Sequence, residues 1–335
     1  MREPAFWQQR NSLLSRLLMP LGAVYGDITA ARMMRQGTVV GIPVICIGNY
    51  HTGGAGKTPT TLAMVKLLRE LNETPVVLSR GHGGKLRGPV KVEPSRHSAA
   101  DVGDEPLMMA RDVPVVIARD RVEGAALARS TGASVIVMDD GFQNPAIAKD
   151  LSLIVIDGNR GLGNGRIFPA GPLRAPLDRQ IELSDGLMVI GDGTAATGVA
   201  ALVHGRGGKV FTARLKPDAA SVQALQGKRA LAFAGIGDPG RFFRTLRNAG
   251  VDVAMEKAFG DHHPYAAVEI DALVAQARSE GLALVTTEKD LVKLKDMPDA
   301  ADIVGFAVAL DVEDKDGLRS LVRETLNRAK AGIKR

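Results

Sequence analysis

The residues Gly53-Gly54-Ala55-Gly56-Lys57-Thr58 point most directly to a chemistry. Small residues let backbone N–H groups wrap around phosphate oxygens, while a lysine neutralises their charge and a hydroxyl can bind Mg²⁺. The strict form of such a loop has glycine where His51 stands, so the match is imperfect. A buried-strand pattern before the loop and a helical pattern after it supply the expected context. We therefore predict a P-loop, with Lys57 on nucleotide phosphates and Thr58 on a metal ion.

Two adjacent carboxylates, Asp139 and Asp140, follow the apolar run at residues 134–138. Ligands of open α/β sheets gather at the carboxyl ends of strands, where such a pair can hold or orient Mg²⁺. Asp-Asp-Gly is also a good turn sequence, so a solvated turn is the alternative. Because a P-loop lies upstream, we favour the metal site.

Phosphoryl transfer to a hydroxyl benefits from a base, and two loop-like segments offer one. They are Gly103-Asp104-Glu105-Pro106 and Asp261-His262-His263-Pro264-Tyr265. An isolated Asp-Glu pair is usually a helix cap, and an isolated His pair usually lies at the surface. The residue types alone leave both roles open.

Buried strands and amphipathic helices alternate through the first part of the chain. The run at residues 38–47 is nearly continuous and β-branched, and residues 60–71 have helical periodicity. Further strands are predicted at 75–78, 113–118, 134–138 and 151–156. This alternation predicts an α/β fold with a doubly wound, mostly parallel sheet of the P-loop NTPase type.

The second part of the chain has the pattern of a smaller α/β/α unit. Strands are predicted at 230–236, 251–256 and 282–286, with helices at 239–248 and 267–277. Residues 209–215 and 304–312 each have a strand pattern, and their pairing would form a two-stranded hinge. We predict a P-loop domain at 1–208 and a smaller domain at 209–335, with 313–335 packing back on the first domain.

Composition limits the cellular setting and the partners. The 335 residues are 45% hydrophobic and include one cysteine, Cys46, which lies in an apolar run and indicates a reducing compartment. A formal net charge of +6 favours an anionic partner. Aromatic residues make up only 4% and do not alternate with Lys and Arg, which argues against nucleic acid as a partner. We predict no obligate protein partner.

An amphipathic helix is predicted at the N-terminus, over about residues 1–35. Its uncharged stretch is too short for a membrane span, and Pro20 interrupts it. A signal peptide is not expected, because a nucleotide site follows soon afterwards. Two interpretations stay open: a helix packed on the protein body, or an interfacial anchor with Phe6 and Trp7 at the lipid headgroups.

Taken together, these segments resemble the tetraacyldisaccharide 4′-kinase family of lipid A biosynthesis. The resemblance runs through nearly the whole chain, and its specificity comes from many segments in one order. Besides the segments above, it covers Ile42-Pro43-Val44, Gly48-Asn49, Leu78-Ser79-Arg80-Gly81, Asp139-Asp140-Gly141-Phe142-Gln143, Pro169-Ala170-Gly171-Pro172-Leu173-Arg174 and Thr287-Glu288-Lys289-Asp290. His82 stands where the family commonly has tyrosine, and Ala175 where it commonly has glutamate.

The resemblance implies an activity, cofactors and a location. The family uses ATP and Mg²⁺ to phosphorylate the 4′-hydroxyl of an acylated glucosamine disaccharide 1-phosphate, which forms lipid IVA. It acts at the cytoplasmic face of the bacterial inner membrane, and the N-terminal helix would contact that surface.

The resemblance also implies roles for individual residues. Lys57 and Thr58 would bind phosphate and metal, and Asp139, Asp140 and Glu105 would belong to the metal site. Asp104 would be the base and His262 its partner from the second domain. Arg121 and Arg174 would lie near the substrate.

Two rival functions start from the same P-loop. A nucleotide switch of the partitioning or metallochaperone type has a similar loop, but often with a second lysine before the paired glycines, where this chain has Thr52. A nucleic-acid motor would use the positive charge, but this sequence has no aromatic platform on which bases could stack. Phosphorylation of a lipid hydroxyl would distinguish the kinase from both.

Overall fold

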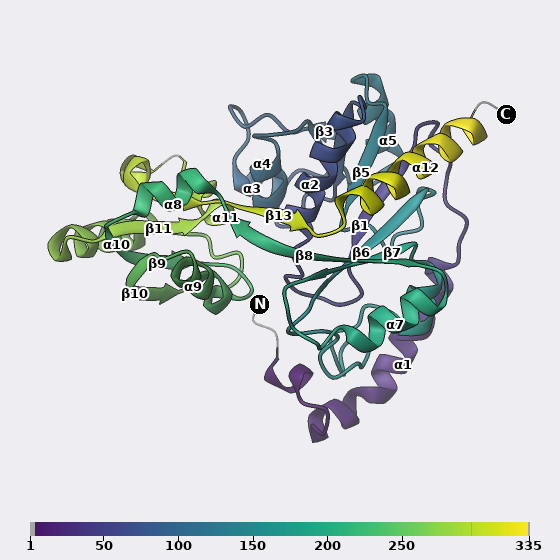
Figure 1. Ribbon diagram of the computed structural model, residues 1–335, viewed down its shortest axis with the longest axis horizontal. Helices are drawn as coiled ribbons and strands as arrows, with labels where there is room; N and C mark the ends of the chain where they lie inside the picture. Colours follow the sequence, from purple (N-terminus) through teal and green to yellow (C-terminus); the bar gives the residue numbers. More distant parts are fainter. Residues whose placement is uncertain (1–3, 296, 334–335) are drawn as a thin grey trace.

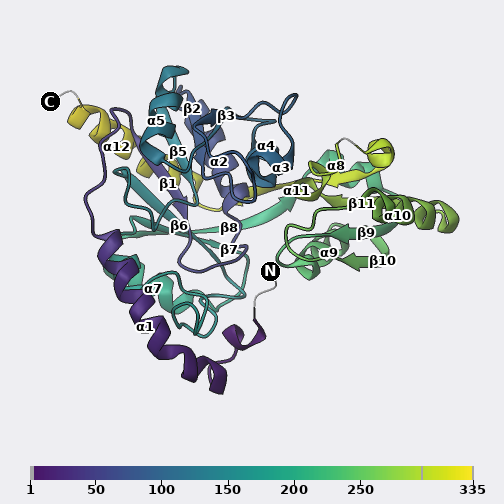
Figure 2. The same ribbon diagram turned by 180° about the vertical axis from the view of Figure 1, so that it is seen from behind.

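The computed structural model describes residues 4–295 and 297–333, which form two lobes (Figure 1). Within these residues, the larger lobe is built on a nine-stranded sheet and the smaller on a four-stranded sheet. Strands β8 and β13 run between the lobes, and the N-terminal helix α1 projects below the larger one (Figures 1 and 2). The lobes therefore meet at a junction that strands of the large sheet form.

The large sheet is parallel except at its two edges. Its order is β13-β8-β7-β6-β1-β5-β2-β4-β3, and only β3 and β13 run antiparallel to their neighbours. The buried runs of β-branched residues form its central strands, as expected for a sheet covered on both faces. The strands are β1 (Val44–Gly48), β2 (Pro75–Ser79), β3 (Val90–Lys91), β4 (Val115–Ile117), β5 (Val135–Asp139), β6 (Leu151–Asp157), β7 (Gly186–Ile190), β8 (Lys209–Pro217) and β13 (Val308–Val312).

Helices cover both faces of the large sheet, and each face has its own hydrophobic core. One core packs the strands against α2 (Lys57–Glu70), the short α3 (Ala99–Val102) and α4 (Asp104–Met109), and the C-terminal α12 (Lys315–Ile333). The other packs them against α5 (Arg121–Ser130), α6 (Leu177–Glu182) and α7 (Thr197–Gly205). This is the doubly wound arrangement that the sequence predicts.

The small lobe is a three-layer unit on a parallel sheet of order β10-β9-β11-β12. Its strands are β9 (Arg229–Ala234), β10 (Asp252–Ala258), β11 (Ala283–Thr287) and β12 (Val304–Phe306). Helices α8 (Ala219–Leu225) and α9 (Pro239–Asn248) cover one face, while α10 (Ala267–Glu280) and the 3₁₀ turn η2 (Pro298–Asp302) cover the other. The short α11 (Glu288–Leu291) follows β11 directly and faces the large lobe.

The connection between the lobes differs from the prediction in one respect. Residues 304–312 are not one strand but two, because the chain changes partner at Ala307: β12 pairs with β11, and β13 pairs with β8. The predicted pairing of the two connecting segments is present, with Leu310 opposite Leu215. However, β8 also pairs with β7, so the connector is the edge of the large sheet. The domain division at residue 208 stays a prediction.

Two further differences concern the large sheet. The strand predicted at 38–47 is regular only from Val44, because Pro43 lacks the N–H that a central strand must donate. Strand β7 is not among the strands predicted above, although all five of its residues are buried.

The N-terminal segment consists of the 3₁₀ turn η1 (Ala5–Gln8) and α1 (Leu13–Met33). Helix α1 packs on the large lobe through small residues, since Ser15 donates to the Ala170 carbonyl at 2.6 Å and a Cβ on Gly22 would lie 2.9 Å from the Ile167 oxygen. Among the described residues, no helix combines the length and the apolar character needed to span a bilayer.

Candidate active site

The P-loop connects the carboxyl end of β1 to the first turn of α2, which begins at Lys57. Gly56 caps this helix with φ +93°, and a Cβ there would lie 2.6 Å from the Ile190 side chain, so glycine is required at this position. The free N–H groups of the helix and its dipole favour an anion in front of the loop. Thr58 lies in the same first turn. The loop thus has the geometry of a phosphate site.

Asp140 lies beside this loop and is held by two cations. Arg174 donates to its two carboxylate oxygens at 2.5 and 3.1 Å, and the Lys57 Nζ lies 3.9 Å away. Burial raises the pKa of Asp140, but Lys57 and Arg174 outweigh that effect and hold the pKa well below its usual range. Asp140 is therefore ionised and already paired. Its φ of +49° is uncommon for a residue with a side chain and is typical of functional sites.

Asp139, the last residue of β5, is almost completely buried behind the loop. Thr61 and Ser79 donate to its two oxygens, each at 3.4 Å. Burial and the nearby charges of Glu105 and Asp140 raise the pKa of Asp139 to about 7. A carboxylate in this setting gains from a nearby cation.

Arg121 is predicted from the sequence to lie near the substrate, but in the structure only 2% of its surface is exposed. Its guanidinium donates to the Ala118 carbonyl, and burial lowers its pKa although Asp139 opposes that shift. In the described part of the chain its Nε has no hydrogen-bond partner. This position suits an electrostatic effect near Asp139 better than contact with a large lipid.

Asp104 and His262 meet across the junction of the two lobes. The His262 Nδ1 lies 2.9 Å from the Asp104 Oδ2, although the residues are 158 positions apart. Burial raises the pKa of Asp104, but the bond to His262 and the charges of Lys289 and Lys293 outweigh it and lower that pKa overall. The bond to Asp104 in turn raises the pKa of His262. The arrangement provides an ionised carboxylate oriented by a histidine, which can accept a proton from a hydroxyl held beside it.

The local backbone explains how the pair is placed. Gly103 has φ +92°, and a Cβ on it would lie 2.4 Å from the His82 oxygen, so the turn before Asp104 needs glycine. His262 has φ +57° and donates its N–H to the Gly235 carbonyl at the carboxyl end of β9. The start of α4 and the carboxyl end of β9 therefore both lie at the junction.

Glu105 is paired with a residue that has no assigned role in the predicted site. The Lys289 Nζ lies 2.9 Å from the Glu105 Oε1 and 3.9 Å from the Asp104 Oδ2. Lys293 lies 3.6 Å from the same Asp104 oxygen. Two lysines of the small lobe thus reach the Asp104-Glu105 pair.

The predicted metal residues lie around the P-loop without forming a closed cage. Among the described residues, no group of three or more His, Cys, Asp or Glu side chains is arranged to hold a metal ion. Mg²⁺ at nucleotide sites usually takes one or two carboxylates, with phosphates and water completing its shell. Asp139 and the Thr58 hydroxyl fit that donor set, whereas Asp140 and Glu105 are occupied by Arg174 and Lys289.

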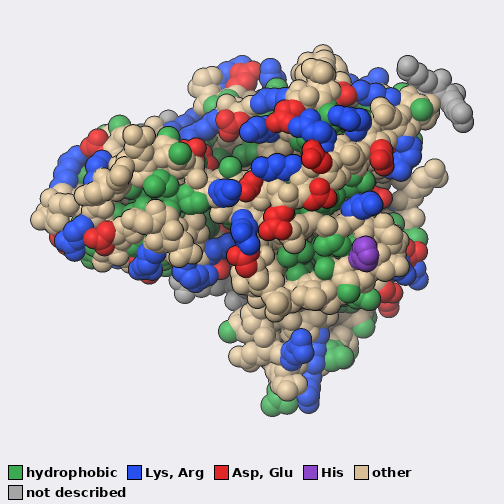
Figure 3. Space-filling view, viewed as in Figure 1, with side chains coloured by type: hydrophobic (Ala, Val, Ile, Leu, Met, Phe, Trp, Pro, Cys, Tyr) green, Lys and Arg blue, Asp and Glu red, His purple; other side chains and the backbone are tan. Residues whose placement is uncertain are grey.

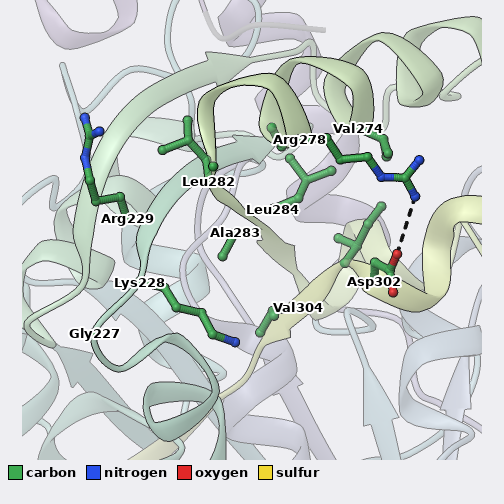
Figure 4. A pocket seen from close by; sticks show the side chains of 13 residues that line it. Gly227, Lys228, Arg229, Val274, Arg278, Leu282, Ala283, Leu284, Asp302 and Val304 are labelled. Carbon is green, nitrogen blue, oxygen red and sulfur yellow. Dashed lines mark ion pairs between the residues drawn. The ribbon is translucent and has the colours of Figure 1, made fainter.

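A cavity of about 610 Å³ lies in the small lobe, and Figure 4 shows the side chains that line it. It is lined by the first residues of β9, β11 and β12, including Arg229, Ala283 and Val304, and by Arg278, which pairs with Asp302. His262 is bonded to the opposite, carboxyl end of β9. Since ligands of parallel sheets gather at carboxyl ends, the junction is the candidate active site.

Comparison with known families agrees with this geometry. A family model described as LpxK, tetraacyldisaccharide-1-P 4′-kinase, matches residues 14–327. This chain belongs to the tetraacyldisaccharide 4′-kinase family. The match includes the P-loop, both carboxylate pairs, His262 and Lys289, so every part of the site described above lies within the family region.

Curated relatives in the tetraacyldisaccharide 4′-kinase family are similar over nearly the whole chain. The tetraacyldisaccharide 4′-kinase of Rhodopseudomonas palustris strain HaA2 is 65% identical over 332 residues, covering 98% of each chain. That of Bradyrhizobium diazoefficiens is 63% identical over 331 residues, again covering 98% of each. The crystal structure of LpxK from Aquifex aeolicus in complex with ATP has a TM-score of 0.75 at 27% identity, covering 94% of this chain and 100% of that one.

The structure contains three contacts that are not predicted from the sequence. They are the Lys289–Glu105 pair, the Arg241–Asp157 pair at 2.6 Å, which also joins the lobes, and the contact of His82 with His262, whose ring centroids are 5.8 Å apart. Lys289 lies in the Thr287-Glu288-Lys289-Asp290 segment of the family resemblance, and that segment could have indicated a role for it. Arg241 has no comparable signal, because its partner lies 84 positions away.

Proposed function

We propose that this protein is a tetraacyldisaccharide 4′-kinase, which transfers the γ-phosphate of ATP to the 4′-hydroxyl of an acylated glucosamine disaccharide 1-phosphate. The observation that carries the proposal is the Asp104–His262 bond at 2.9 Å, formed across the junction of two lobes beside a P-loop. A nucleotide switch needs the P-loop but has no use for a base oriented toward an alcohol. Relatives at 61–65% identity are named tetraacyldisaccharide 4′-kinases, which supports the same activity.

The nucleotide would bind in front of the P-loop. The backbone of residues 53–56 and the N-terminus of α2 supply N–H donors for phosphate oxygens, and Lys57 supplies a positive charge. LpxK from Aquifex aeolicus, which shares this fold, was crystallised with ATP. Phosphates carrying several negative charges would also compete with Asp140 for Lys57, which is 3.9 Å from it.

We propose Thr58 and Asp139 as the residues that hold Mg²⁺, with Asp140 and Glu105 oriented around it. Mg²⁺ bound there would neutralise phosphate charge. The support is the buried position of Asp139 and its pKa of about 7, which indicates a carboxylate short of positive charge. Thr58→Ala is expected to raise the Mg²⁺ concentration needed for half-maximal activity.

Asp104 would act as the base. The 4′-hydroxyl oxygen forms a bond to the γ-phosphorus while the bond from that phosphorus to the β,γ-bridging oxygen breaks, and ADP leaves with the bonding pair. The hydroxyl proton passes to the Asp104 carboxylate, whose other oxygen is held by His262. Arg174 and Arg121 would supply fixed positive potential near the transferred group.

The surface of α1 supports attachment to the cytoplasmic face of the bacterial inner membrane. Its large apolar side chains point outward at helical spacing: Leu13, Leu17, Leu21, Val24 and Ile28 are 60–76% exposed. Figure 3 shows hydrophobic side chains next to Lys and Arg at the tip of the α1 projection. Leucines beside arginines suit an interface between acyl chains and lipid phosphates. This arrangement favours the anchor over a helix that buries its apolar face on the protein.

Direct assay with a defined lipid tests the proposal. Purified protein would be incubated with Mg-ATP and a tetraacyldisaccharide 1-phosphate in detergent micelles. The lipid products would then be separated, and their masses would be measured by mass spectrometry. We expect one added phosphate per disaccharide and one ADP per product. Nucleotide hydrolysis with no phosphorylated lipid would instead support the nucleotide switch.

A further inference from the structure

The segment that follows β11 carries two lysines to the carboxylates of the opposite lobe. Lys289 lies in α11, and Lys293 lies one turn further along the chain. Both ammonium groups are within 4 Å of the Asp104 Oδ2, at 3.9 and 3.6 Å. The carboxylate that we propose as the base is therefore surrounded by groups from the small lobe.

The two lysines differ in what else they contact. Lys293 pairs at 2.7 Å with Asp290, whose side chain is fully buried in its own lobe and also accepts the Gly235 N–H. Lys289 forms its ion pairs with Glu105 and Asp104 alone among the described residues, and both of these belong to the large lobe. Removing the Lys293 charge would leave a buried carboxylate unpaired, whereas removing the Lys289 charge affects the junction.

Asp104 and Glu105 are adjacent carboxylates in a largely buried setting, so their charges repel each other strongly. Lys289 lies between them, 2.9 Å from one and 3.9 Å from the other. Its ammonium group offsets the repulsion and draws both side chains toward the small lobe, where His262 bonds to Asp104. Without that charge, the two carboxylates would move apart and the lobes would lose an attractive contact.

We propose that Lys289 is a positioning residue for phosphoryl transfer: by bridging Glu105 and Asp104 it closes the small lobe onto the large one and sets the base against His262. This proposal rests on the proposed kinase function. It assigns a role to the Thr287-Glu288-Lys289-Asp290 segment, which delivers the lysine from the carboxyl end of β11. Lys289 acts through the carboxylates and need not touch the substrate.

Kinetics of matched lysine variants test the proposal. Lys289→Met keeps the length of the side chain but removes its charge, and we expect kcat to fall about 10- to 100-fold, as for other residues that orient catalytic groups. KM for ATP should change much less, because the P-loop is untouched. Lys289→Arg should recover most of the lost kcat.

Lys295 provides the control. It also joins the lobes, by donating to the carbonyls of Pro94 and His97 at 3.0 and 2.7 Å, and neither contact involves Asp104 or Glu105. Lys295→Met should therefore keep nearly wild-type kcat. A Lys289→Met enzyme as active as this control would overturn the proposal, as would a Lys289→Arg enzyme as impaired as Lys289→Met.

A distance measurement tests closure without relying on activity. Ser130 on α5 and Ser279 on α10 are exposed, and the natural Cys46 is buried, so cysteines at the two serine positions can carry spin labels. We expect Lys289→Met to lengthen or broaden the distance between the lobes, and Lys289→Arg to keep it. An unchanged distribution would overturn the closing role. If wild-type protein does not phosphorylate the lipid, the kinase proposal fails, while this measurement still decides the closing role.

Discussion

Lys57 is the cation that we propose the P-loop presents to a nucleotide, and its surroundings indicate function more than stability. Its side chain is 12% exposed, and its ion pair with Asp140 is long, at 3.9 Å. An ion pair of this length contributes at most about 1 kcal/mol to folding. The same charge acting on the phosphates of a nucleotide, where negative charge builds up during the reaction, is worth far more to phosphoryl transfer.

Lys57→Ala should therefore remove activity and leave the fold intact. We expect kcat to fall by at least roughly 10²- to 10³-fold. The melting temperature should change by less than about 4 °C. Lys66→Ala, at an exposed position of the same helix, is the control and should change neither quantity. A loss of activity that follows a large fall in melting temperature would contradict the assignment.

His51 makes the stability of the folded protein depend on pH. Burial lowers its pKa to about 4, so the folded protein keeps it neutral below the pH at which the unfolded chain, with an ordinary pKa of about 6.5, takes up a proton. Proton uptake by the unfolded chain alone lowers the free energy of unfolding as the pH falls. Between pH 7 and pH 4 this amounts to about 3 kcal/mol.

His51→Asn should remove that dependence. Its amide nitrogen can replace the His51 Nδ1, which lies 2.7 Å from the Thr52 carbonyl, but it does not titrate. Urea unfolding of both proteins from pH 7 to pH 4 measures the effect. We expect the wild type to lose about 3 kcal/mol more than the variant, and parallel curves would contradict the account.

At the scale of elements, α1 reverses the usual orientation of a surface helix. Its buried positions are Ser15, Gly22, Gly26 and Met33, while Leu13, Leu14, Leu17 and Leu21 face outward. Small residues allow close contact with the loop that holds Ile167, where a Cβ on Gly26 would lie 2.7 Å from the Ile167 Cδ1. The helix is thus attached to the protein by one face and leaves the other exposed, as the proposed membrane anchor requires.

Leu17→Gln combined with Leu21→Gln should weaken membrane binding without unfolding the protein, because these side chains are 76% and 61% exposed. Activity toward lipid embedded in vesicles should fall more than activity toward lipid dispersed in detergent. Gly22→Leu is the complementary variant, since it disturbs packing but keeps the apolar face, and it should lower the melting temperature. Equal losses of activity in vesicles and detergent would contradict an anchoring role for the helix.

The elements of the sheets could largely be predicted from local patterns. Central strands such as β5 and β6 are continuous apolar runs, and α9 has the bounds that its periodicity predicts. The patterns could not show that residues 304–312 change partner at Ala307, since both halves have the same β-rich composition. They also could not show which face of α1 is buried, because periodicity identifies an apolar stripe but not its surroundings.

At the scale of the whole molecule, the site depends on contacts between lobes that have no local pattern. Asp104 and His262 could be paired in advance only through the family resemblance, because 158 residues separate them. Lys289 and Arg241 show the limit of that approach, since their partners follow from how the lobes sit together. Three charged contacts at one junction, those of His262, Lys289 and Arg241, join the two lobes, and we propose that closure of the lobes forms them.

The most direct test of this account measures kcat for lipid phosphorylation in Asp104→Asn, His262→Ala and the double variant, with ATP binding measured in parallel. Each single change should lower kcat by roughly 10²- to 10⁴-fold, the range for loss of a general base. Because the two residues act as one unit, the double variant should lose little more than the worse single variant, and ATP binding should stay close to wild type. Losses that multiply in the double variant, or a fully active His262→Ala enzyme, would contradict a base assembled across the two lobes.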